Sequence, residues 1–369
     1  MALSENNMER IAAIDWMRGI VMILMALDHA SGMFNDGRIF ADSILLYEVG
    51  SIFATDQFLT RWITHICAPT FVFLAGTGIA INTIQRRAQG TGNTKIDREI
   101  LIRGAFIALL DLIVFSLLSG KVVLQVLYAI GISMMLIVPL RRLGMNTILI
   151  CALMILLGGE LFTLWLWDPK DDVPYWLALT FMPSFGESVS VMYPFAPWLA
   201  IMMLGWVFGE WLMKERKNRW SSTRFLMVSG LLALICFVLI RVNDGYGNML
   251  MYFEGNSIVQ WLHISKYPPS LAYTVLELGL MAIILAFLMW LEPKIKVRKN
   301  APVLVYGQTA LFFYLAHFCV LVGLSFIFSR GGLEQAYLAA LIALIILYPI
   351  CRIYRTLKWR YPQSVLRFL

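Results

Sequence analysis

The first hydrophobic segment of the chain carries ionisable side chains at both of its ends. Arg18 lies near its start, and Asp28 and His29 lie near its end. In an α-helix, the eleven residues from Arg18 to His29 rotate to within about 20° of a whole number of turns and rise roughly 16 Å. Both side chains are therefore expected on one face. An ionisable group inside a bilayer costs about 2.5–3.5 kcal/mol on insertion scales, so such groups are candidates for function.

An alternative interpretation is that these residues anchor the helix at the two membrane interfaces. Arg18 would reach one headgroup layer, and Asp28 and His29 would reach the other. This interpretation accounts for each end separately but gives no reason for the shared face.

Histidine is the usual general base near neutral pH, and the chain has four histidines. They are His29, His65, His263 and His317. With the topology given below, all four fall in the outer half of the molecule. We expect His29 or His65 to be the base, whereas a hydrogen-bonded structural role is the simpler interpretation of His263 and His317.

Asp28 directly precedes His29, so on a helix its side chain points about 100° away from the imidazole. The two residues cannot easily form the oriented carboxylate–imidazole pair of a catalytic triad. A partner for His29 is expected from elsewhere, with Asp56, Glu48 and His65 as candidates. The sequence contains no G-x-S-x-G elbow, P-loop or H-E-x-x-H zinc motif.

Two further carboxylates, Asp111 and Glu277, fall at membrane depth and are expected to face the interior of a helix bundle. They either line a substrate path or pair with Arg18 or Arg103. A structural pairing is the simpler interpretation of each.

The composition places the chain among membrane proteins. Of 369 residues, 60% are hydrophobic and 14% are charged, and the mean hydropathy is +0.74. A soluble domain does not have this balance. The net charge of +7 reflects the distribution of Lys and Arg between loops rather than nucleic-acid binding. No cleavable signal peptide is evident, and the five cysteines show no spacing typical of disulfides or metal ligands.

We predict an all-α polytopic membrane protein with about ten transmembrane helices in one bundle. Each segment is close to the ~20 residues that a spanning helix needs. The predicted spans are 14–33, 65–84, 100–119, 122–140, 146–164, 195–213, 222–241, 269–291, 302–328 and 335–353. Residues 1–369 form one transmembrane domain, and residues 354–369 are expected to form a basic cytoplasmic tail.

The positive-inside rule orients this bundle. With the N-terminus inside, 23 of the 30 Lys and Arg residues fall on the inner side. An even number of spans then places both termini in the cytoplasm. Three longer segments lie outside, at about 34–64, 165–194 and 242–268, and their aromatic and acidic residues suit a carbohydrate or another polar acceptor. An interfacial aromatic belt is the alternative account of the Trp and Tyr residues.

The order of several motifs resembles the bacterial relatives of heparan-α-glucosaminide N-acetyltransferase, the catalytic-domain family within the transmembrane acyltransferase superfamily. The resemblance covers about residues 8–330. The motifs are Arg10-x4-Asp15-x2-Arg18-Gly19-x5-Met25-x3-His29, His65-x-Cys-Ala-Pro69-Thr-Phe-Val-Phe-Leu-Ala-Gly76, Tyr193-Pro-x2-Pro197-Trp198-x6-Gly205 and Lys266-Tyr-Pro-Pro-Ser-Leu271.

The resemblance implies transfer of an acetyl group from cytoplasmic acetyl-CoA to a sugar amine or hydroxyl across the membrane. It also implies an essential histidine on the non-cytoplasmic side. The lysosomal enzyme of this family carries that histidine between spans one and two. This chain has no histidine between Ala30 and Thr64, so His29 or His65 is the equivalent. Direct transfer and an acetyl-histidine intermediate both stay open.

The expected site follows from the resemblance together with the chemistry of the residues. Acetyl-CoA is the expected acyl donor, and neither a metal nor haem is expected. The other partners are a carbohydrate or amino-sugar acceptor and the lipid bilayer, with no nucleic acid; a homodimer stays open, and the bacterial cytoplasmic (inner) membrane is the expected location. The catalytic candidates are His29, His65 and Asp28, the candidates for binding acetyl-CoA are Arg18, Asp15 and Arg103, and those for the acceptor are Lys266, Tyr267, Trp198 and His317.

Three other functions compete with acyl transfer. A transporter would also have about ten spans and intramembrane charges, although no internal repeat is visible. A haem-binding electron carrier would need facing histidines, and His29 and His65 could form such a pair. A membrane protein that kept the fold and lost the activity is the third alternative.

Overall fold

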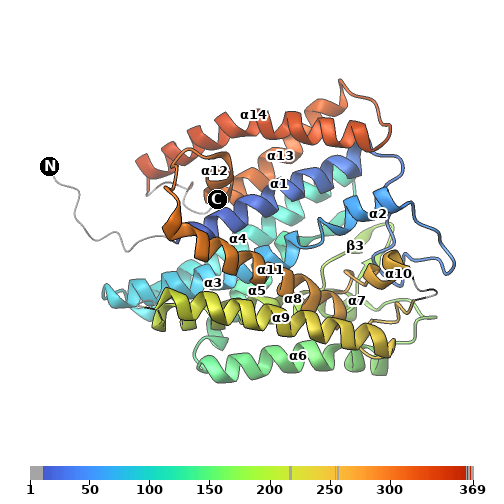
Figure 1. The fold of residues 1–369 in the computed structure, drawn as a ribbon, viewed down its shortest axis with the longest axis horizontal. Helices are drawn as coiled ribbons and strands as arrows, with labels where there is room; N and C mark the ends of the chain where they lie inside the picture. The colour runs from blue at the N-terminus through green and yellow to red at the C-terminus, as the bar shows by residue number, and fades with distance from the viewer. Residues whose placement is uncertain are drawn as a thin grey trace.

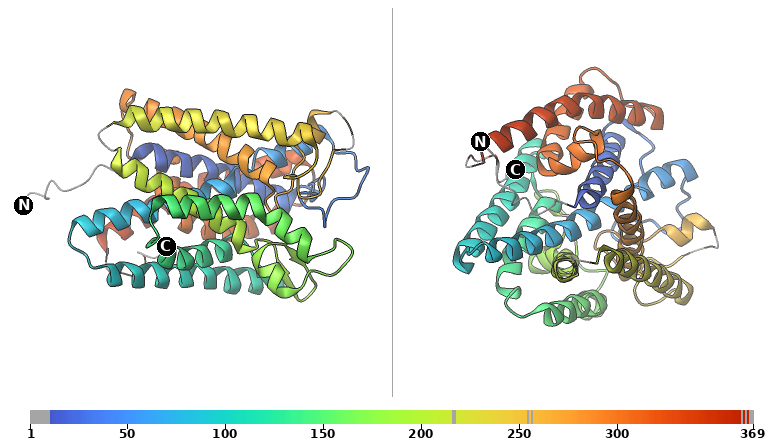
Figure 2. Two further views of the ribbon diagram at one scale, coloured as in Figure 1. Left: turned by 90° about the horizontal axis from the view of Figure 1, so that it is seen from below. Right: turned by 60° about the vertical axis from the view of Figure 1, so that its left-hand side comes forward.

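A computed structural model describes residues 11–215, 218–253, 255, 257–362, 364 and 366. The described chain is a bundle of long helices, as predicted, with most of the short elements at one end (Figures 1 and 2). The long helices are α1 (Ala12–Phe34), α3 (Cys67–Ala88), α4 (Asn93–Ser119), α5 (Val126–Leu140), α6 (Met145–Leu166), α8 (Phe195–Lys214), α9 (Arg219–Asn243), α11 (Leu271–Leu291), α13 (Ala310–Ser325) and α14 (Leu333–Arg360).

Within the described residues, eight helices are long and apolar enough to cross a membrane, or nine if one bent pair counts as a span. The bent pair is α12 (Pro302–Gln308) with α13, which meet at 103°. The 15-residue α5 is shorter and also apolar. The chain is thus an all-α polytopic membrane protein, while the number of crossings and the side of each terminus stay predictions.

Two predicted spans differ from the structure. The segment 122–140 begins with the strand β1 (Val122–Leu124), so α5 starts only at Val126. The segment 302–328 is not one straight helix, because it is interrupted at Thr309 between α12 and α13. At the C-terminal end, α14 continues to Arg360, so the first part of the expected tail 354–369 is helical.

Most of the short elements lie at the end of the bundle that we call the loop end, formed by segments 35–54, 167–194, 244–253 and 257–270. It contains α2 (Thr55–Trp62), α7 (Tyr175–Thr180) and α10 (Ile258–Leu262). β1 pairs in parallel with β3 (Val189–Val191), which pairs antiparallel with β2 (Ser184–Phe185). This small sheet ties the α4–α5 turn to the segment that leads into α8.

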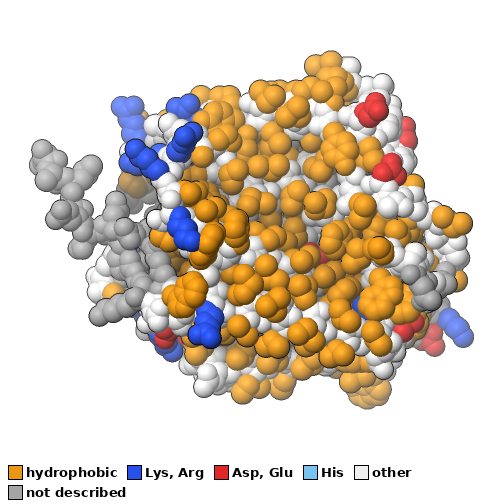
Figure 3. Space-filling model, in the orientation of Figure 1, with side chains coloured by type: hydrophobic (Ala, Val, Ile, Leu, Met, Phe, Trp, Pro, Cys, Tyr) orange, Lys and Arg blue, Asp and Glu red, His pale blue; other side chains and the backbone are white. Residues whose placement is uncertain are grey.

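The opposite end carries the basic helix ends, and we call it the basic end. Its cations include Arg86, Arg87, Lys214, Lys294 and Lys358, and the turn η1 (Glu292–Lys294) follows α11 there. On the face drawn in Figure 3, Lys and Arg gather at this end, hydrophobic side chains cover the middle, and several acidic side chains lie at the loop end. This distribution is typical of a protein whose middle faces lipid. Arg10, Arg216, Lys217 and Arg367 lie outside the described residues.

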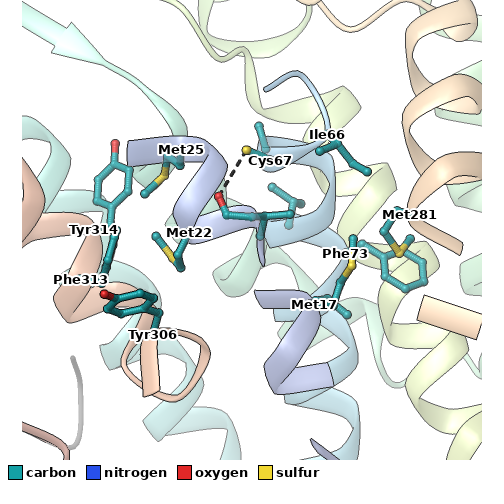
Figure 4. Packing of buried hydrophobic residues seen from close by; sticks show 14 of the residues in the cluster. Met17, Met22, Met25, Ile66, Cys67, Phe73, Met281, Tyr306, Phe313 and Tyr314 are labelled. Atoms are coloured by element: carbon teal, nitrogen blue, oxygen red, sulfur yellow. Dashed lines mark hydrogen bonds between the residues drawn. The ribbon is translucent and has the colours of Figure 1, made fainter. Parts of the chain in front are cut away.

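Helix α1 runs through the centre of the bundle, against α3, α11, α12, α13 and α14. Figure 4 shows Met17, Met22 and Met25 of α1 packed among side chains that include residues of α3, α11, α12 and α13. The Cys67 thiol on α3 donates a hydrogen bond of 3.3 Å to the Val21 carbonyl of α1. A Cβ on Gly19 or Gly307 would meet the backbone where α1 and α12 touch, so only glycine permits this approach.

Small residues also bring α3 and α8 together. A side chain at Gly205 would meet the Phe73 carbonyl, and one at Gly76 would meet the Met202 carbonyl. The Thr77 hydroxyl crosses the same contact and hydrogen-bonds to the Gly205 carbonyl at 3.0 Å. Close backbone approach of this kind is how helices pack where lipid supplies no hydrophobic driving force.

Candidate functional site

A cavity of about 1120 Å³ extends through the bundle from the basic end to the loop end. One face of α1 forms its wall, with Arg18 and His29 both lining it. The predicted shared face is therefore confirmed. The lining residues of α1 recur at helical spacing: Ile14, Asp15, Arg18, Met25, Asp28, His29, Gly32 and Met33.

His29 is bonded to a second histidine. Its Nδ1 lies 2.6 Å from Nε2 of His317 on α13, and the two rings are nearly parallel. The Phe318 and Tyr314 rings flank His29, with centroids 4.6 and 6.2 Å away. The partner of His29 is thus His317.

The candidates Asp56, Glu48 and His65 were wrong for this role. His317 could not be found from spacing, because the two histidines are 288 residues apart in the chain.

Asp28 turns away from His29, as predicted, and binds cations from the loop end. Its Oδ1 accepts hydrogen bonds from Arg38 at 2.9 Å, Arg61 at 2.7 Å and the Thr64 hydroxyl at 3.0 Å. Arg38 also donates to the Asp28 backbone carbonyl. Asp28 therefore forms a hydrogen-bonded hub, a centre of contacts that holds the segment 35–54 and α2 against the end of α1.

Arg61 connects this hub to Asp42, a residue that the sequence analysis did not single out. The Arg61 Nε donates to Asp42 Oδ2 at 2.7 Å, and a second guanidinium nitrogen also contacts Oδ2. The Asp42 backbone carbonyl accepts hydrogen bonds from the N–H groups of Lys266 and Tyr267. Burial would raise the pKa of Asp42, but the charges of Arg61, His65 and Lys266 hold that pKa far below its ordinary value.

His65 lies behind this network and does not line the cavity. Its Nε2 is 3.3 Å from Asp42 Oδ1, and the Tyr273 hydroxyl donates to its backbone carbonyl at 2.9 Å. His65 is thus placed to hold Asp42, whereas His29 faces the cavity. The arrangement also leaves His29 and His65 unbonded to each other, because each has a different partner.

Lys266 and Tyr267 do line the cavity at the loop end, as expected for acceptor-binding candidates. Lys266 is 3% exposed, and its ammonium lies 5.4 Å from the Tyr267 ring centroid. The Tyr267 hydroxyl is 3.5 Å from that of Tyr193, which also lines the cavity. Burial raises the pKa of Tyr267, but Lys266 and Arg61 outweigh it and lower that pKa below its ordinary value.

The other two acceptor-binding candidates, Trp198 and His317, lie behind the cavity wall. Trp198 is fully buried, and its ring packs against Tyr193 at 4.9 Å between centroids. His317 is also fully buried and contacts the cavity-lining residues His29, Tyr314 and Phe318. Neither side chain is placed to touch an acceptor directly.

The basic end of the cavity contains the three candidates for binding acetyl-CoA. Arg18, Asp15 and Arg103 all line it. Arg18 donates to the Leu74 carbonyl at 2.8 Å and lies 3.6 Å from Asp15. Gln308, at the break between α12 and α13, donates to Asp15 at 3.4 Å.

Four more cations line the cavity that were not predicted from the sequence: Arg86 and Lys358 at this end, and Arg38 and Arg61 at the other. A signal was present for the last pair, because they are two of only seven cations assigned to the outer side.

Asp111 has a structural role, as the sequence favoured, but its partners are backbone N–H groups and not the predicted Arg18 or Arg103. It lies on α4, and its Oδ2 accepts the N–H groups of Gln125 and Tyr128, at the start of α5. It therefore caps the first turn of α5 from a neighbouring helix. Glu277 is buried on α11.

The arrangement offers two chemistries within one cavity. At the basic end, cations and the interrupted α12–α13 backbone face a space suited to a polyanion. At the loop end, an accessible imidazole lies beside a cluster of hydrogen-bonding cations and phenols. Proton abstraction from a polar acceptor is the reaction that such an imidazole supports.

A known protein family matches the larger part of the chain. The family described as "Heparan-alpha-glucosaminide N-acetyltransferase, catalytic" matches residues 10–240, which is more than half of the chain. The chain belongs to this family. Its membership in the heparan-alpha-glucosaminide N-acetyltransferase family supports a membrane acetyltransferase.

The match to the heparan-alpha-glucosaminide N-acetyltransferase family includes the whole of α1 and the Asp28–Arg61–Asp42 network. It does not reach Lys266, Tyr267 or His317. No curated protein matches the chain.

Proposed function

We propose that this protein transfers an acyl group, acetyl in the first instance, from acyl-CoA to an amine or hydroxyl of a sugar. Acyl-CoA would enter at the basic end of the cavity and the acceptor at the loop end. The observation that carries the proposal is that a single cavity is lined by Arg18 at one end and His29 at the other.

The basic end suits the donor because CoA is a polyanion. Arg18, Arg86, Arg103 and Lys358 line the cavity there and would attract its phosphates. Arg18 and His29 are roughly 16 Å apart along α1, a span that the extended pantetheine arm can cover. The thioester would then lie beside His29. At about 1120 Å³, the cavity is larger than the ~300–1,000 Å³ typical of a site for one ligand.

The loop end suits a polar acceptor. His29 would accept the proton of the acceptor amine or hydroxyl as its nitrogen or oxygen attacks the thioester carbonyl carbon. The C–S bond then breaks, and the CoA thiolate leaves and takes up a proton. In the alternative path, His29 itself attacks, and the acetyl-imidazole passes the group to the acceptor. Lys266 and Tyr267 would bind the acceptor, while Asp28 and its cations keep the end of α1 in place.

We further propose that the basic end faces the cytoplasm and the loop end faces away from it. The excess of Lys and Arg at the basic end supports this orientation. The membrane would be a bacterial cytoplasmic membrane, and the acceptor a glycan or amino sugar on its outer side.

The test is turnover of acetyl-CoA labelled in the acetyl group by purified protein in nanodiscs, with a panel of amino sugars. We expect the wild-type protein to release CoA and label an acceptor. His29→Ala should lose this activity by about 10²–10⁴-fold, the usual contribution of a positioned base. His263→Gln is the matched control, because His263 is a buried histidine that does not line the cavity.

Each other outcome points to a different answer. Loss of activity in His65→Ala but not in His29→Ala would move the base to the start of α3. Release of no CoA by any form, with any acceptor, would contradict acyl transfer and favour a transporter. Ternary-complex kinetics without a trappable acetyl label would exclude the acetyl-histidine path.

A further inference from the structure

His317 is a buried imidazole whose two nitrogens both have a partner. It lies on α13 and is fully buried. Its Nδ1 is 3.2 Å from the carbonyl oxygen of Phe313, one turn earlier on the same helix. Its Nε2 is 2.6 Å from Nδ1 of His29. The match to the known family ends at residue 240, so it gives His317 no role.

The positions of the protons follow from these two contacts. A carbonyl oxygen only accepts hydrogen bonds, so the Nδ1 of His317 must carry a proton. A fully buried imidazole without a carboxylate partner among the described side chains is in its neutral form. A neutral ring has one N–H group, so the Nε2 of His317 is an acceptor. The Nδ1 of His29 must then be the donor in the 2.6 Å contact.

The remaining nitrogen of His29, Nε2, consequently has no proton and carries a free lone pair. In the described part of the chain, no group forms a hydrogen bond with the Nε2 of His29. The His29 ring lines the cavity, and Nε2 is on the side of the ring remote from the Nδ1 that meets His317. A nitrogen lone pair on the cavity side is what a general base or a nucleophile needs.

We propose that His317 is a positioning residue that holds His29 in the tautomer with its basic Nε2 toward the cavity. The proposal rests on the proposed function for its catalytic meaning. When Nε2 takes the acceptor proton, the resulting imidazolium keeps donating through Nδ1 to His317, in a charge-assisted hydrogen bond. His317 thus takes the place that a carboxylate has in a catalytic triad, without bringing a negative charge into the bundle.

Two variants separate this role from simple packing. His317→Leu fills the buried space with an apolar side chain and removes the hydrogen-bond acceptor. His317→Gln instead supplies a side-chain oxygen that can accept the hydrogen bond from Nδ1 of His29. We expect His317→Leu to lower kcat by about 10²-fold or more, because a wrong tautomer lowers the rate of a triad enzyme by about 10⁴-fold. The KM values for acetyl-CoA and the acceptor should stay within twofold, since His317 does not line the cavity. His317→Gln should recover most of the lost kcat.

A spectroscopic measurement tests the tautomer independently of activity. The chain has four histidines, so ¹⁵N-histidine labelling gives a spectrum that substitutions at His65 and His263 simplify. We expect the wild-type His29 to show a protonated Nδ1 and an unprotonated Nε2, and His317→Leu to show a mixture of tautomers. Size-exclusion profiles of both variants check that they are folded.

Two results would overturn the proposal: a protonated Nε2 on His29 in the wild type, or a His317→Leu protein with unchanged tautomer and unchanged kcat. Failure of the proposed function looks different. In that case the wild type transfers no acetyl group, while the spectrum still shows which nitrogen of His29 carries the proton.

Discussion

Replacing Arg61 with methionine would leave a buried carboxylate without its main partner. Arg61 is the one side chain that binds both Asp28 and Asp42 in the described structure. Asp28 would keep Arg38 at 2.9 Å and Thr64 at 3.0 Å. Among the described side chains, the Asp42 carboxylate would keep only the 3.3 Å contact to the His65 ring, so the loss falls on Asp42.

The expected destabilisation is about 3–5 kcal/mol, the usual range when one partner of a buried ion pair is removed. The size of this destabilisation depends on the uncompensated charge of Asp42 and not on lost packing, because methionine fills most of the arginine volume. Neutralising the second partner should therefore restore stability. We expect Arg61→Met with Asp42→Asn to regain at least half of the loss, giving a coupling energy of about 1.5 kcal/mol or more.

Denaturant unfolding in mixed micelles, followed by the fluorescence of the 12 tryptophans, measures these differences. Asp42→Asn alone completes the double-mutant cycle, and it should be destabilising because it leaves Arg61 with one carboxylate fewer. The reasoning fails if Arg61→Met unfolds at the wild-type denaturant concentration. It also fails if the double variant is no more stable than Arg61→Met.

The same substitution should alter the pH dependence of stability. In the wild type, the lowered pKa of Asp42 makes a stabilising contribution above the ordinary carboxyl value of about 3.9, which is lost as pH falls toward the folded value. Without Arg61, burial has more weight and the pKa of Asp42 rises. The difference in unfolding free energy between the wild type and Arg61→Met should therefore become smaller as the pH falls from 7 to 5. A gap that widens over this range would contradict the assignment of the loss to Asp42.

Three further experiments test the donor site, the packing and the orientation. Arg18→Gln should raise the KM for acetyl-CoA about 10–100-fold with kcat within twofold in the nanodisc assay, as expected from losing a charged hydrogen bond of about 1.5–3 kcal/mol; an unchanged KM would move the phosphates elsewhere. Gly205→Val should prevent stable folding on size exclusion because its Cβ would meet an α3 carbonyl, whereas Gly158→Ala, with open space around it, should be neutral or stabilising by about 0.5–1 kcal/mol; equal behaviour of the two would contradict the close approach. Val49→Cys should react with an impermeant maleimide in intact cells and Gln89→Cys only after permeabilisation, and the reverse pattern would invert the proposed orientation.

Sequence reasoning succeeded where the determining physics is local. The common face of Arg18 and His29 follows from helical periodicity alone, and both residues line the cavity. The membrane character of the helices follows from their hydropathy. The turning of Asp28 away from His29 also follows from the 100° step between neighbouring residues.

It failed where the determining contacts are distant in the chain. His317 meets His29 across 288 residues, and no spacing rule connects them. Asp42 lies in an irregular loop, so nothing in its local sequence shows that Arg61 binds it. The break at Thr309 has no proline beside it, and the excess length of the predicted span 302–328 was the one available signal.

Because α1 lies at the centre of the bundle, the number of residues between Arg18 and His29 cannot change without moving one of these side chains. One face of this helix must present Arg18 to one end of the cavity and His29 to the other, while His29 also meets His317. Inserting a single residue between them would rotate His29 by about 100° and advance it by 1.5 Å, which separates it from both the cavity and its partner. Inserting residues in the exposed part of the segment 35–54 would change neither the position of His29 relative to the cavity nor its contact with His317. Natural variants of this protein should therefore differ in loop length and keep the eleven-residue interval in α1 without insertions or deletions.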